Sequence, residues 1–451
     1  MTNLTLTKTG VALGVAALAF AACSRDDATP SAAADSTAVA SPIAAEPPPG
    51  TLYGRVTTHG GAVYEGPLRW GDGEEAFWEH AFNGVKDANP WAAYVPDDQL
   101  AVHEPTTIFG IEVPWGDSGP DLRRPFMARL GDVARIESVG DGLRGTVRDV
   151  VEYDPQVRVT LKSGTTFTLD RLEASDFDDG VRVWDARRGV VDLGAREVHT
   201  IDLFAPDVPR EVPARLYGTV HAASGDFTGV LQWNREAALG RDELVGRTDD
   251  GELRLRFDAL RSITRDGDGV LAATKDGSTI ALTGTRQVGR GNLGVYVDDP
   301  RYGRVLVPWN AFERVDFAPD GPSLGYGDFA PGERLAGTVT TTDGRRLAGR
   351  LVYDLDESET TETLDASADG IDYMLPFGQI ASVALSDAET ARVTLRSGEA
   401  LRLDRVGDLG DSNAGLLVFA DDAERLTYVP WADVEQIDFA APTAAVRAGS
   451  D

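Results

Sequence analysis

Three stretches of the chain open alike: residues 52–56 read Leu-Tyr-Gly-Arg-Val, residues 216–220 Leu-Tyr-Gly-Thr-Val and residues 335–339 Leu-Ala-Gly-Thr-Val. Each is followed by a turn glycine and a second glycine, and four residues later by an aromatic residue: Trp70, Trp233 or Tyr353. The stretches close alike on Ile-Asp-Leu at 201–203, Val-Asp-Phe at 315–317 and Ile-Asp-Phe at 437–439. Because such self-similarity is the signature of a repeat architecture, the sequence predicts three repeats, over residues 51–206, 214–319 and 333–442.

Each repeat is itself double. Its second half opens with alternating apolar and polar residues around a Ser-Gly or Asp-Gly turn, at 157–169, 270–282 and 393–403, which predicts a β-hairpin. Both halves end in three apolar residues spaced by three, a spacing that suits one turn of 3₁₀ helix running into a strand. The six triplets are Leu130/Val133/Ile136, Ala195/Val198/Ile201, Phe257/Leu260/Ile263, Trp309/Phe312/Val315, Phe377/Ile380/Val383 and Trp431/Val434/Ile437.

Units of about 50 residues, made of short strands, glycine turns and one 3₁₀ turn, predict an all-β protein. In pattern they resemble small SH3 or Sm-like β-barrels, and the resemblance implies tandem repeats of about six such units in three pairs. Three larger β-sandwiches or a propeller-like array remain alternatives. The one predicted helix spans residues 74–82. The recurring Trp309 and Trp431, like the aromatic residue near the start of each repeat, are predicted to be buried core residues.

The N-terminus carries a targeting pattern. Lys8 supplies a positive charge, residues 11–19 form a short apolar run, and Phe20-Ala21-Ala22-Cys23 places small residues before the only cysteine. This resembles the lipobox of bacterial lipoproteins. The resemblance implies that a signal peptide of residues 1–22 is removed and that Cys23 is acylated, so that the protein is anchored to the cell envelope and extracytoplasmic. Ser24 favours the outer membrane in a diderm; an uncleaved anchor helix or a plain secretory signal is the alternative.

Composition bounds the remaining possibilities. Residues 23–50, rich in Ala, Ser, Asp and Pro, are predicted to be a disordered linker after the lipidated cysteine, and residues 443–451 a disordered tail. The net charge of -30 disfavours nucleic acid as a partner. A single cysteine excludes both an intramolecular disulfide and a thiolate metal cluster.

The first repeat departs from the pattern, because it carries an insertion at about residues 78–125 that is rich in aromatic residues and histidines. Loops on a rigid scaffold commonly carry function, so the insertion is predicted to be a binding surface. A cap over a terminal repeat is an equally good interpretation. The candidate binding residues are Trp78, His80, Phe82, Trp91, Tyr94 and Trp115.

Catalysis and metal binding have weaker support. Glu75 and Glu79, beside His80, could form the carboxylate pair of an envelope polysaccharide hydrolase, but a solvated acidic helix face explains them as well. No cofactor is expected. Calcium is a possibility because Asp residues cluster at 176–180, 266–269 and 354–357. The sequence therefore favours a non-catalytic binding or scaffolding module, whose partner is an envelope protein or a glycan.

Overall fold

The computed structural model describes residues 52–70, 75–86, 88–96, 107–108, 111–112, 124–139, 156–170, 175–207, 214–319, 321, 324–385, 389–420 and 426–443. The predicted signal peptide, Cys23, the linker, Trp115 and nearly all of the tail lie outside these residues. Within them, no helix combines the length and apolarity needed to cross a bilayer.

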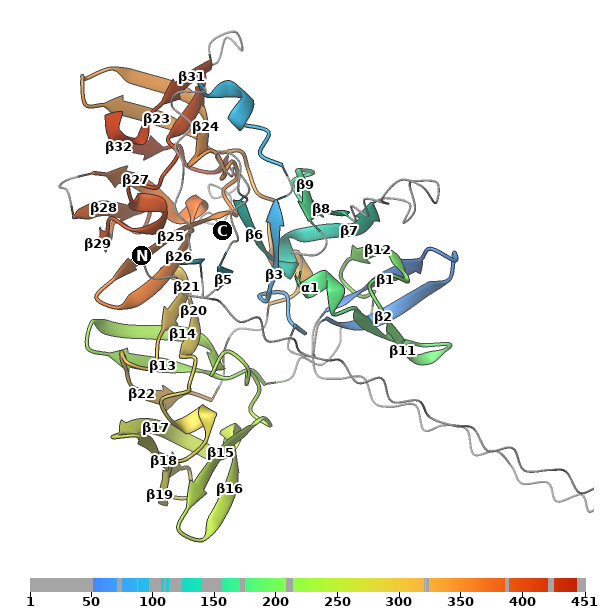
Figure 1. Ribbon diagram of the computed structural model, residues 1–451. Coiled ribbons are helices and arrows are strands. Elements are labelled where there is room, and N and C mark those ends of the chain that lie inside the picture. The colour runs from blue at the N-terminus through green and yellow to red at the C-terminus, as the bar shows by residue number, and fades with distance from the viewer. Residues whose placement is uncertain are drawn as a thin grey trace, which may run out of the picture. The chain divides into compact units, whose positions relative to one another are not determined.

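The described chain is all-β, as predicted, and its strands pair antiparallel (Figure 1). The first repeat holds β1 (Tyr53–Thr58), β2 (Val63–Trp70), β3 (Ala81–Lys86), β4 (Thr107–Ile108), β5 (Ile111–Glu112), β6 (Arg124–Arg129), β7 (Val133–Val139), β8 (Gln156–Leu161), β9 (Thr166–Asp170), β10 (Val181–Asp185), β11 (Gly189–Leu193) and β12 (Val198–Leu203). Its short helices are η1 (Ala92–Tyr94), η2 (Leu130–Asp132) and α1 (Ser175–Asp178).

The other repeats follow the same plan. The second holds β13 (Tyr217–Ala222), β14 (Gly225–Trp233), β15 (Glu243–Thr248), β16 (Gly251–Arg256), η3 (Phe257–Ala259), β17 (Leu260–Asp266), β18 (Gly269–Thr274), β19 (Thr279–Leu282), η4 (Arg286–Val288), β20 (Val295–Asp299), β21 (Gly303–Val307) and β22 (Phe312–Phe317). The third, after η5 (Tyr326–Asp328), holds β23 (Ala336–Thr341), β24 (Arg346–Tyr353), β25 (Thr363–Ala368), β26 (Ile371–Pro376), η6 (Phe377–Gln379), β27 (Ile380–Ala384), β28 (Thr390–Leu395), β29 (Ala400–Asp404), η7 (Gly407–Leu409), β30 (Leu416–Phe419), β31 (Leu426–Val429), η8 (Trp431–Asp433) and β32 (Val434–Phe439).

One strand order recurs in all three repeats. The sheets run β11-β10-β2-β1-β12-β7-β8-β9, β21-β20-β14-β13-β22-β17-β18-β19 and β31-β30-β24-β23-β32-β27-β28-β29. The remaining hairpin of each repeat (β3–β6, β15–β16 or β25–β26) contacts the last of these strands. The two predicted halves are therefore interleaved rather than consecutive: the first hairpin pairs with strands from the end of the repeat. The SH3 or Sm-like nature of the units stays a prediction.

The repeated glycines mark close approaches between strands. Gly218 and Gly229 face each other across β13 and β14, and Gly54/Gly66 and Gly337/Gly349 do so in the other repeats. A Cβ atom at Gly229 would lie 2.0 Å from the carbonyl oxygen of Asp298, a distance that side chains do not tolerate. Glycine is therefore required at these positions, which explains why the opening motif recurs.

The predicted core is confirmed. Every residue of the six triplets is buried, and four triplets start on a 3₁₀ turn while the other two start on a hydrogen-bonded turn. Trp70, Trp233 and Tyr353 are buried too, and each donates its polar hydrogen to a backbone carbonyl, at Asp176, Gln287 and Asp408 respectively. The recurring aromatic residue thus packs the core and fixes one loop in each repeat.

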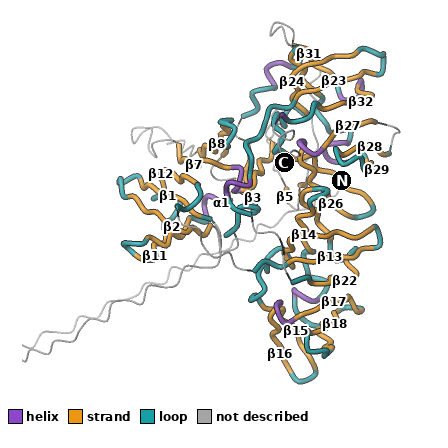
Figure 2. Tube along the Cα trace, turned by 180° about the vertical axis from the view of Figure 1, so that it is seen from behind, coloured by secondary structure: helices purple, strands orange, loops and turns teal. Residues whose placement is uncertain are grey.

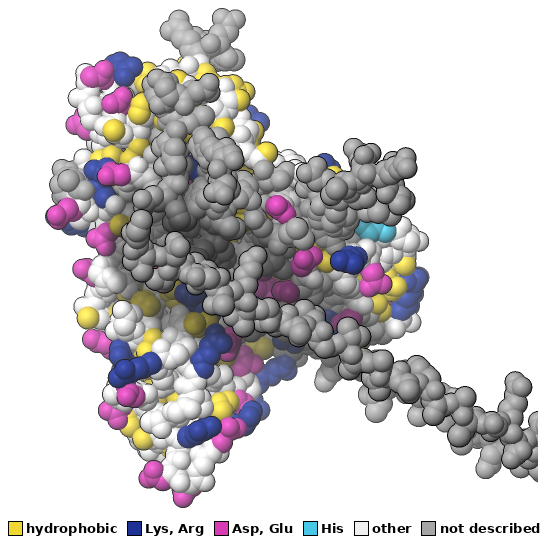
Figure 3. Space-filling view, viewed as in Figure 1, with side chains coloured by type: hydrophobic (Ala, Val, Ile, Leu, Met, Phe, Trp, Pro, Cys, Tyr) yellow, Lys and Arg dark blue, Asp and Glu magenta, His cyan; other side chains and the backbone are white. Residues whose placement is uncertain are grey.

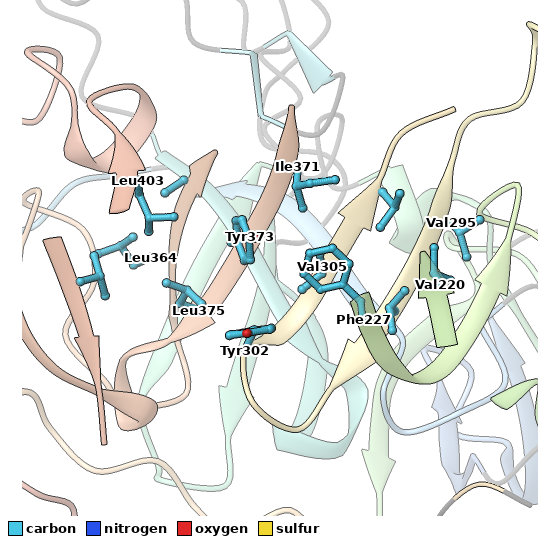
Figure 4. Close-up of a cluster of buried hydrophobic side chains, with 14 of the residues drawn as sticks. Val220, Phe227, Val295, Tyr302, Val305, Leu364, Ile371, Tyr373, Leu375 and Leu403 are labelled. Atoms are coloured by element: carbon cyan, nitrogen blue, oxygen red, sulfur yellow. The ribbon is translucent and has the colours of Figure 1, made fainter. Parts of the chain in front are cut away.

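Repeats 2 and 3 share one core, and the β25–β26 hairpin of repeat 3 extends the sheet of repeat 2. β21 pairs with β26, so that Val305 lies opposite Tyr373. Figure 4 shows Phe227, Tyr302 and Tyr373 meeting between the aliphatic residues of the two repeats. Repeat 1 has a core of its own, to which Phe329 from the segment before repeat 3 is added. Figure 2, from behind, shows the strands of repeats 2 and 3 following one another in a row.

The predicted helix at 74–82 is wrong for its described residues. Residues 77–80 form turns, and residues 81–86 form β3, which pairs with β6 and β9. The Nδ1 atom of His80 accepts hydrogen bonds from the backbone N–H groups of Ala76 and Phe77, at 2.9 and 3.3 Å. Such side chain to backbone bonds compete with helix formation.

Candidate functional site

The insertion of repeat 1 takes the place of a tight turn. In repeat 3, β25 and β26 are joined by Asp369-Gly370, both with positive φ, and Asp249-Asp250 join the matching strands of repeat 2. In repeat 1 the matching strands are β3 and β6, and residues 87–123 stand between them. Insertions in repeat proteins map to loops, often on the binding face, so the root of this insertion is the first place to look for a site.

The described start of the insertion, residues 88–96, packs against repeat 3. The rings of Trp91 and Tyr94 lie edge-on to Phe419, with centroids 6.0 and 6.2 Å apart. Val95 is buried in a small apolar cluster with residues of β24 and β30. The side-chain amide of Asn89 donates to the Leu355 carbonyl at 2.9 Å. The described start of the insertion therefore covers part of a face of the third repeat.

A cavity of about 270 Å³ lies where the insertion, β9 and repeat 3 meet. Trp91 and Phe167 give it aromatic surface, while hydroxyl groups and charged groups supply the polar part. The residues that line it are Lys86, Ala88, Asn89, Pro90, Trp91, Arg124, Thr165, Thr166, Phe167, Thr168, Asp356 and Ser358. Aromatic surface with a few convergent polar groups is the usual composition of a ligand site.

Lys86, a cation that lines the cavity, forms ion pairs with buried carboxylates. Lys86 Nζ lies 2.5 Å from Asp356 Oδ1 and 3.2 Å from Glu362 Oε1, and all three side chains are about nine-tenths buried. Burial alone would lower the pKa of Lys86, but the two carboxylates outweigh it and raise that pKa, so Lys86 stays charged. Ser163 and Thr165 donate to Glu359 beside the cavity. The site therefore suits a neutral polar ligand better than an ion.

Asp354 is an acid held at the same junction. Its Oδ1 accepts a hydrogen bond from the backbone N–H of Ala414, and the matching Asn234 of repeat 2 accepts one from Leu293 at 3.0 Å. Burial raises the pKa of Asp354 to about 7, although the charge of Arg124 lowers it. The Asp354 carboxyl can thus be protonated and neutral near pH 7, at the position where repeat 2 has the neutral side-chain amide of Asn234.

Comparisons with family models, curated proteins and solved structures give no match. The site is therefore interpreted from its own geometry.

Three of the predicted binding residues lie in the interior instead. Trp78 is 1% exposed and packs against Tyr326, with ring centroids 4.9 Å apart. Phe82, also 1% exposed, meets Trp70 edge-on. His80 is buried, and burial holds its pKa well below the usual value, so it is neutral. These three residues belong to the core and its turns, because the chain from 77 to 86 carries β3 rather than a surface loop.

Trp91 and Tyr94 are the predicted binding residues that the structure leaves partly accessible. Trp91 is half-buried and lines the cavity, whereas Tyr94 is 50% exposed and does not line it. Trp115 lies outside the described residues. The prediction thus named one residue of the cavity and missed the others.

Glu79 does not lie on a solvated helix face. It is 7% exposed, and its Oε2 lies 3.2 Å from Arg215 Nη1 of repeat 2, while Arg304 donates to its backbone carbonyl at 2.9 Å. Burial raises the pKa of Glu79, and the charge of Arg215 opposes that shift. Glu75 bridges to Trp70 through the backbone, and neither glutamate lines the cavity. Their positions assign Glu79 to the junction with repeat 2.

The three Asp-rich segments have structural roles: the first carries α1, and the other two form turns. Asp176 accepts hydrogen bonds from the backbone of Asn83, and Asp268 forms an ion pair with Arg290. Asp354 accepts the Ala414 bond already described. Across the described ranges, no three acidic, histidine or cysteine side chains are grouped as a metal would require.

Of the missed cavity residues, Lys86 had a sequence signal, the rarity of lysine. The chain has lysine only at positions 8, 86, 162 and 275. Lys86 joins repeat 1 to repeat 3. Lys162 of repeat 1 donates to the carbonyls of Tyr326 and Phe329, at 2.5 and 2.8 Å, in the segment that connects repeats 2 and 3. Two of the four lysines thus hold repeat 1 to the remainder of the chain.

Proposed function

We propose that this protein is a non-catalytic binding module of the cell envelope, anchored through Cys23, that holds an envelope glycan in the cavity beside Lys86. The observation that carries the proposal is the cavity itself, which lies at the root of the insertion unique to repeat 1. Its volume of about 270 Å³ is just below the range of drug-sized ligand sites, which suits one sugar ring rather than a long chain.

The chemistry of the walls favours a sugar. Trp91 and Phe167 offer flat apolar surfaces, and Thr166, Thr168 and Ser358 offer hydroxyl groups that both donate and accept. A neutral polyol can pack against the aromatic rings and hydrogen-bond to the hydroxyl groups without breaking the Lys86 ion pairs. An anion would meet Asp356, and the strongly negative chain as a whole repels it.

Hydrolysis has no comparable support. The two carboxylates that it needs, at Glu75 and Glu79, are away from the cavity, and Glu79 is occupied by Arg215. The face seen in Figure 3 intersperses acidic and basic side chains over repeats 2 and 3, without a broad patch of one sign. A binding role, with a neutral ligand, therefore explains the described features best.

Calorimetric titration of the full chain with soluble envelope glycan fragments tests the proposal. Trp91→Phe should weaken binding about tenfold, which corresponds to about 1.4 kcal/mol, while Trp184→Phe on β10, which does not line the cavity, should leave it unchanged. No heat of binding with any fragment, or equal affinity of both variants, would contradict it.

A second variant separates the insertion from the scaffold. Replacing residues 87–123 by Asp-Gly, the turn that repeat 3 uses, keeps the β3–β6 hairpin and removes the insertion. In crosslinking from intact cells, the wild-type chain should be captured on glycan and this variant should not. Capture of a protein by both chains would instead indicate a scaffold with a protein partner.

A further inference from the structure

The two strands that join repeats 2 and 3 have counterparts at the two ends of the row that these repeats form, and each counterpart is a sheet edge. β21, the ninth strand of its repeat along the chain, pairs with β26, which is the fourth strand of the next repeat. The strand that corresponds to β21 in repeat 3 is β31, because both run into Val-Pro-Trp. The strand that corresponds to β26 in repeat 2 is β16, because both run into a Phe that starts a 3₁₀ turn.

Both corresponding strands are edges in the described part of the chain. β31 ends its sheet, and β16 pairs only with β15. Figures 1 and 2 place β16 and β31 at opposite ends of the row formed by repeats 2 and 3. They cannot meet within one chain, because the β21–β26 junction lies between them. Unpaired N–H and C=O groups along an edge are a template for another strand.

We propose that β31 of one copy of the chain pairs with β16 of a second copy, repeating the β21–β26 junction between molecules. The known register transfers directly: Arg304, Val305 and Leu306 face Met374, Tyr373 and Asp372. In the intermolecular pair Leu426 faces Arg254, Thr427 faces Leu253, and Tyr428 faces Glu252. None of these three pairs opposes two like charges, so the register contains no repulsive cross-strand pair.

The other edges of the same types are unsuitable. β11 is the strand of repeat 1 that corresponds to β21, and in the same register its Asp192 would face Glu252, which is a repulsive pair. β6 corresponds to β26, and it carries Pro125, which has no N–H to donate. The electrostatics and the proline therefore leave β31 and β16 as the complementary pair.

The association should be weaker than the covalent junction. Within the chain, Phe227, Tyr302 and Tyr373 pack together across the junction. The residues that match Phe227 and Tyr373 are Leu347 and Leu253, which bury less apolar surface. Because the two edges differ, the contact is heterologous and adds copies head to tail rather than closing a dimer.

Charge substitutions at one position test the pairing in the full chain. Leu426→Arg would face Arg254, and Leu426→Glu would face it with opposite charge. Both place a charge at the same half-buried position. Sedimentation at increasing concentration should show wild-type chains associating into longer assemblies. Compared with wild type, association should be about tenfold weaker for Leu426→Arg and stronger for Leu426→Glu. Adding Arg254→Glu to Leu426→Arg should restore it.

A disulfide test fixes the register. With Cys23→Ser in each chain, Thr427→Cys mixed with Leu253→Cys should give a disulfide-linked pair of chains on mild oxidation, and neither variant alone should. Val305→Cys with Tyr373→Cys in one chain is the positive control, since these residues already face each other. Val191→Cys mixed with Leu253→Cys tests β11. The proposal is overturned if wild-type chains stay monomeric, or if Val191 crosslinks as well as Thr427.

Discussion

Repeat 3 is held by two junctions of opposite character. Toward repeat 2 it shares a sheet and an apolar core, through β21 and β26. Toward repeat 1 it makes mainly ion pairs, hydrogen bonds and a cavity, through Lys86, Asn89 and Ser163, beside one small apolar cluster around Val95. The two junctions therefore have different roles. Strand pairing holds repeats 2 and 3 together as one body, while the polar junction contains a cavity that can hold a ligand.

Breaking the polar junction should have the largest effect. Lys86→Met leaves Asp356 and Glu362 buried without their cation, which costs about 3–5 kcal/mol in the free energy of unfolding. Chemical denaturation measures this loss. Lys275→Met, at an exposed turn, is the matched control and should change nothing. An effect below about 1 kcal/mol would mean that the ion pairs do not hold the junction.

Truncating the apolar core that repeats 2 and 3 share should cost slightly less. Leu375 of β26 is fully buried in this core, and Leu375→Ala should lower the free energy of unfolding by about 2–4 kcal/mol. Because no charge is involved, the loss should be the same at pH 5.5 and pH 8. Denaturation at both pH values checks this, and a loss that varies with pH would place titrating groups at this junction as well.

The polar junction should respond to pH. The pKa of Asp354 is about 7 in the folded chain, above its ordinary value of 3.8, because burial outweighs Arg124. A raised pKa means that the folded chain holds a proton that the unfolded chain has released, so stability falls as pH rises from about 4 to about 7. Between pH 5.5 and pH 8 the loss is at most about 2 kcal/mol for this carboxyl.

The natural control for this prediction is Asp354→Asn, because repeat 2 has Asn234 at the matching position with a matching backbone bond. Asn cannot titrate, so the variant should be more stable than wild type at pH 8, with a smaller change between the two pH values. Asp365, whose pKa is also raised to about 7 by burial, would contribute to the change that remains, together with Glu357, Glu362 and Asp408, whose pKa values burial raises as well. An unaltered pH profile would show that Asp354 is not the titrating group.

The repeated fold was predictable because much of its pattern is local. Gly54 and Gly66 face each other within one hairpin, and the triplets such as Leu130/Val133/Ile136 are spaced by the turn that buries them. The interleaving of strands was not predictable, because the register of β2 with β10 depends on residues more than a hundred positions apart. The cavity was missed for the same reason: Lys86 and Asp356 come from different repeats.

The insertion shows the limit of residue type as a guide. Trp78, Phe82 and Trp91 look alike in sequence, yet two are core residues and one lines the cavity. What separates them is the end of β3 at Lys86, after which the chain leaves the sheet. An aromatic-rich stretch therefore predicts burial or binding only once the strand boundary within it is known.

Hydrogen exchange of the full chain, with and without glycan fragments, tests the two-junction description most directly. Amides of β21 and β26 should exchange only through global unfolding and should not respond to the fragments. Amides of residues 88, 89 and 91 should exchange faster and should slow when a fragment binds. Equal protection of both junctions, or slowing at β21 and β26 instead of residues 88–91, would contradict it.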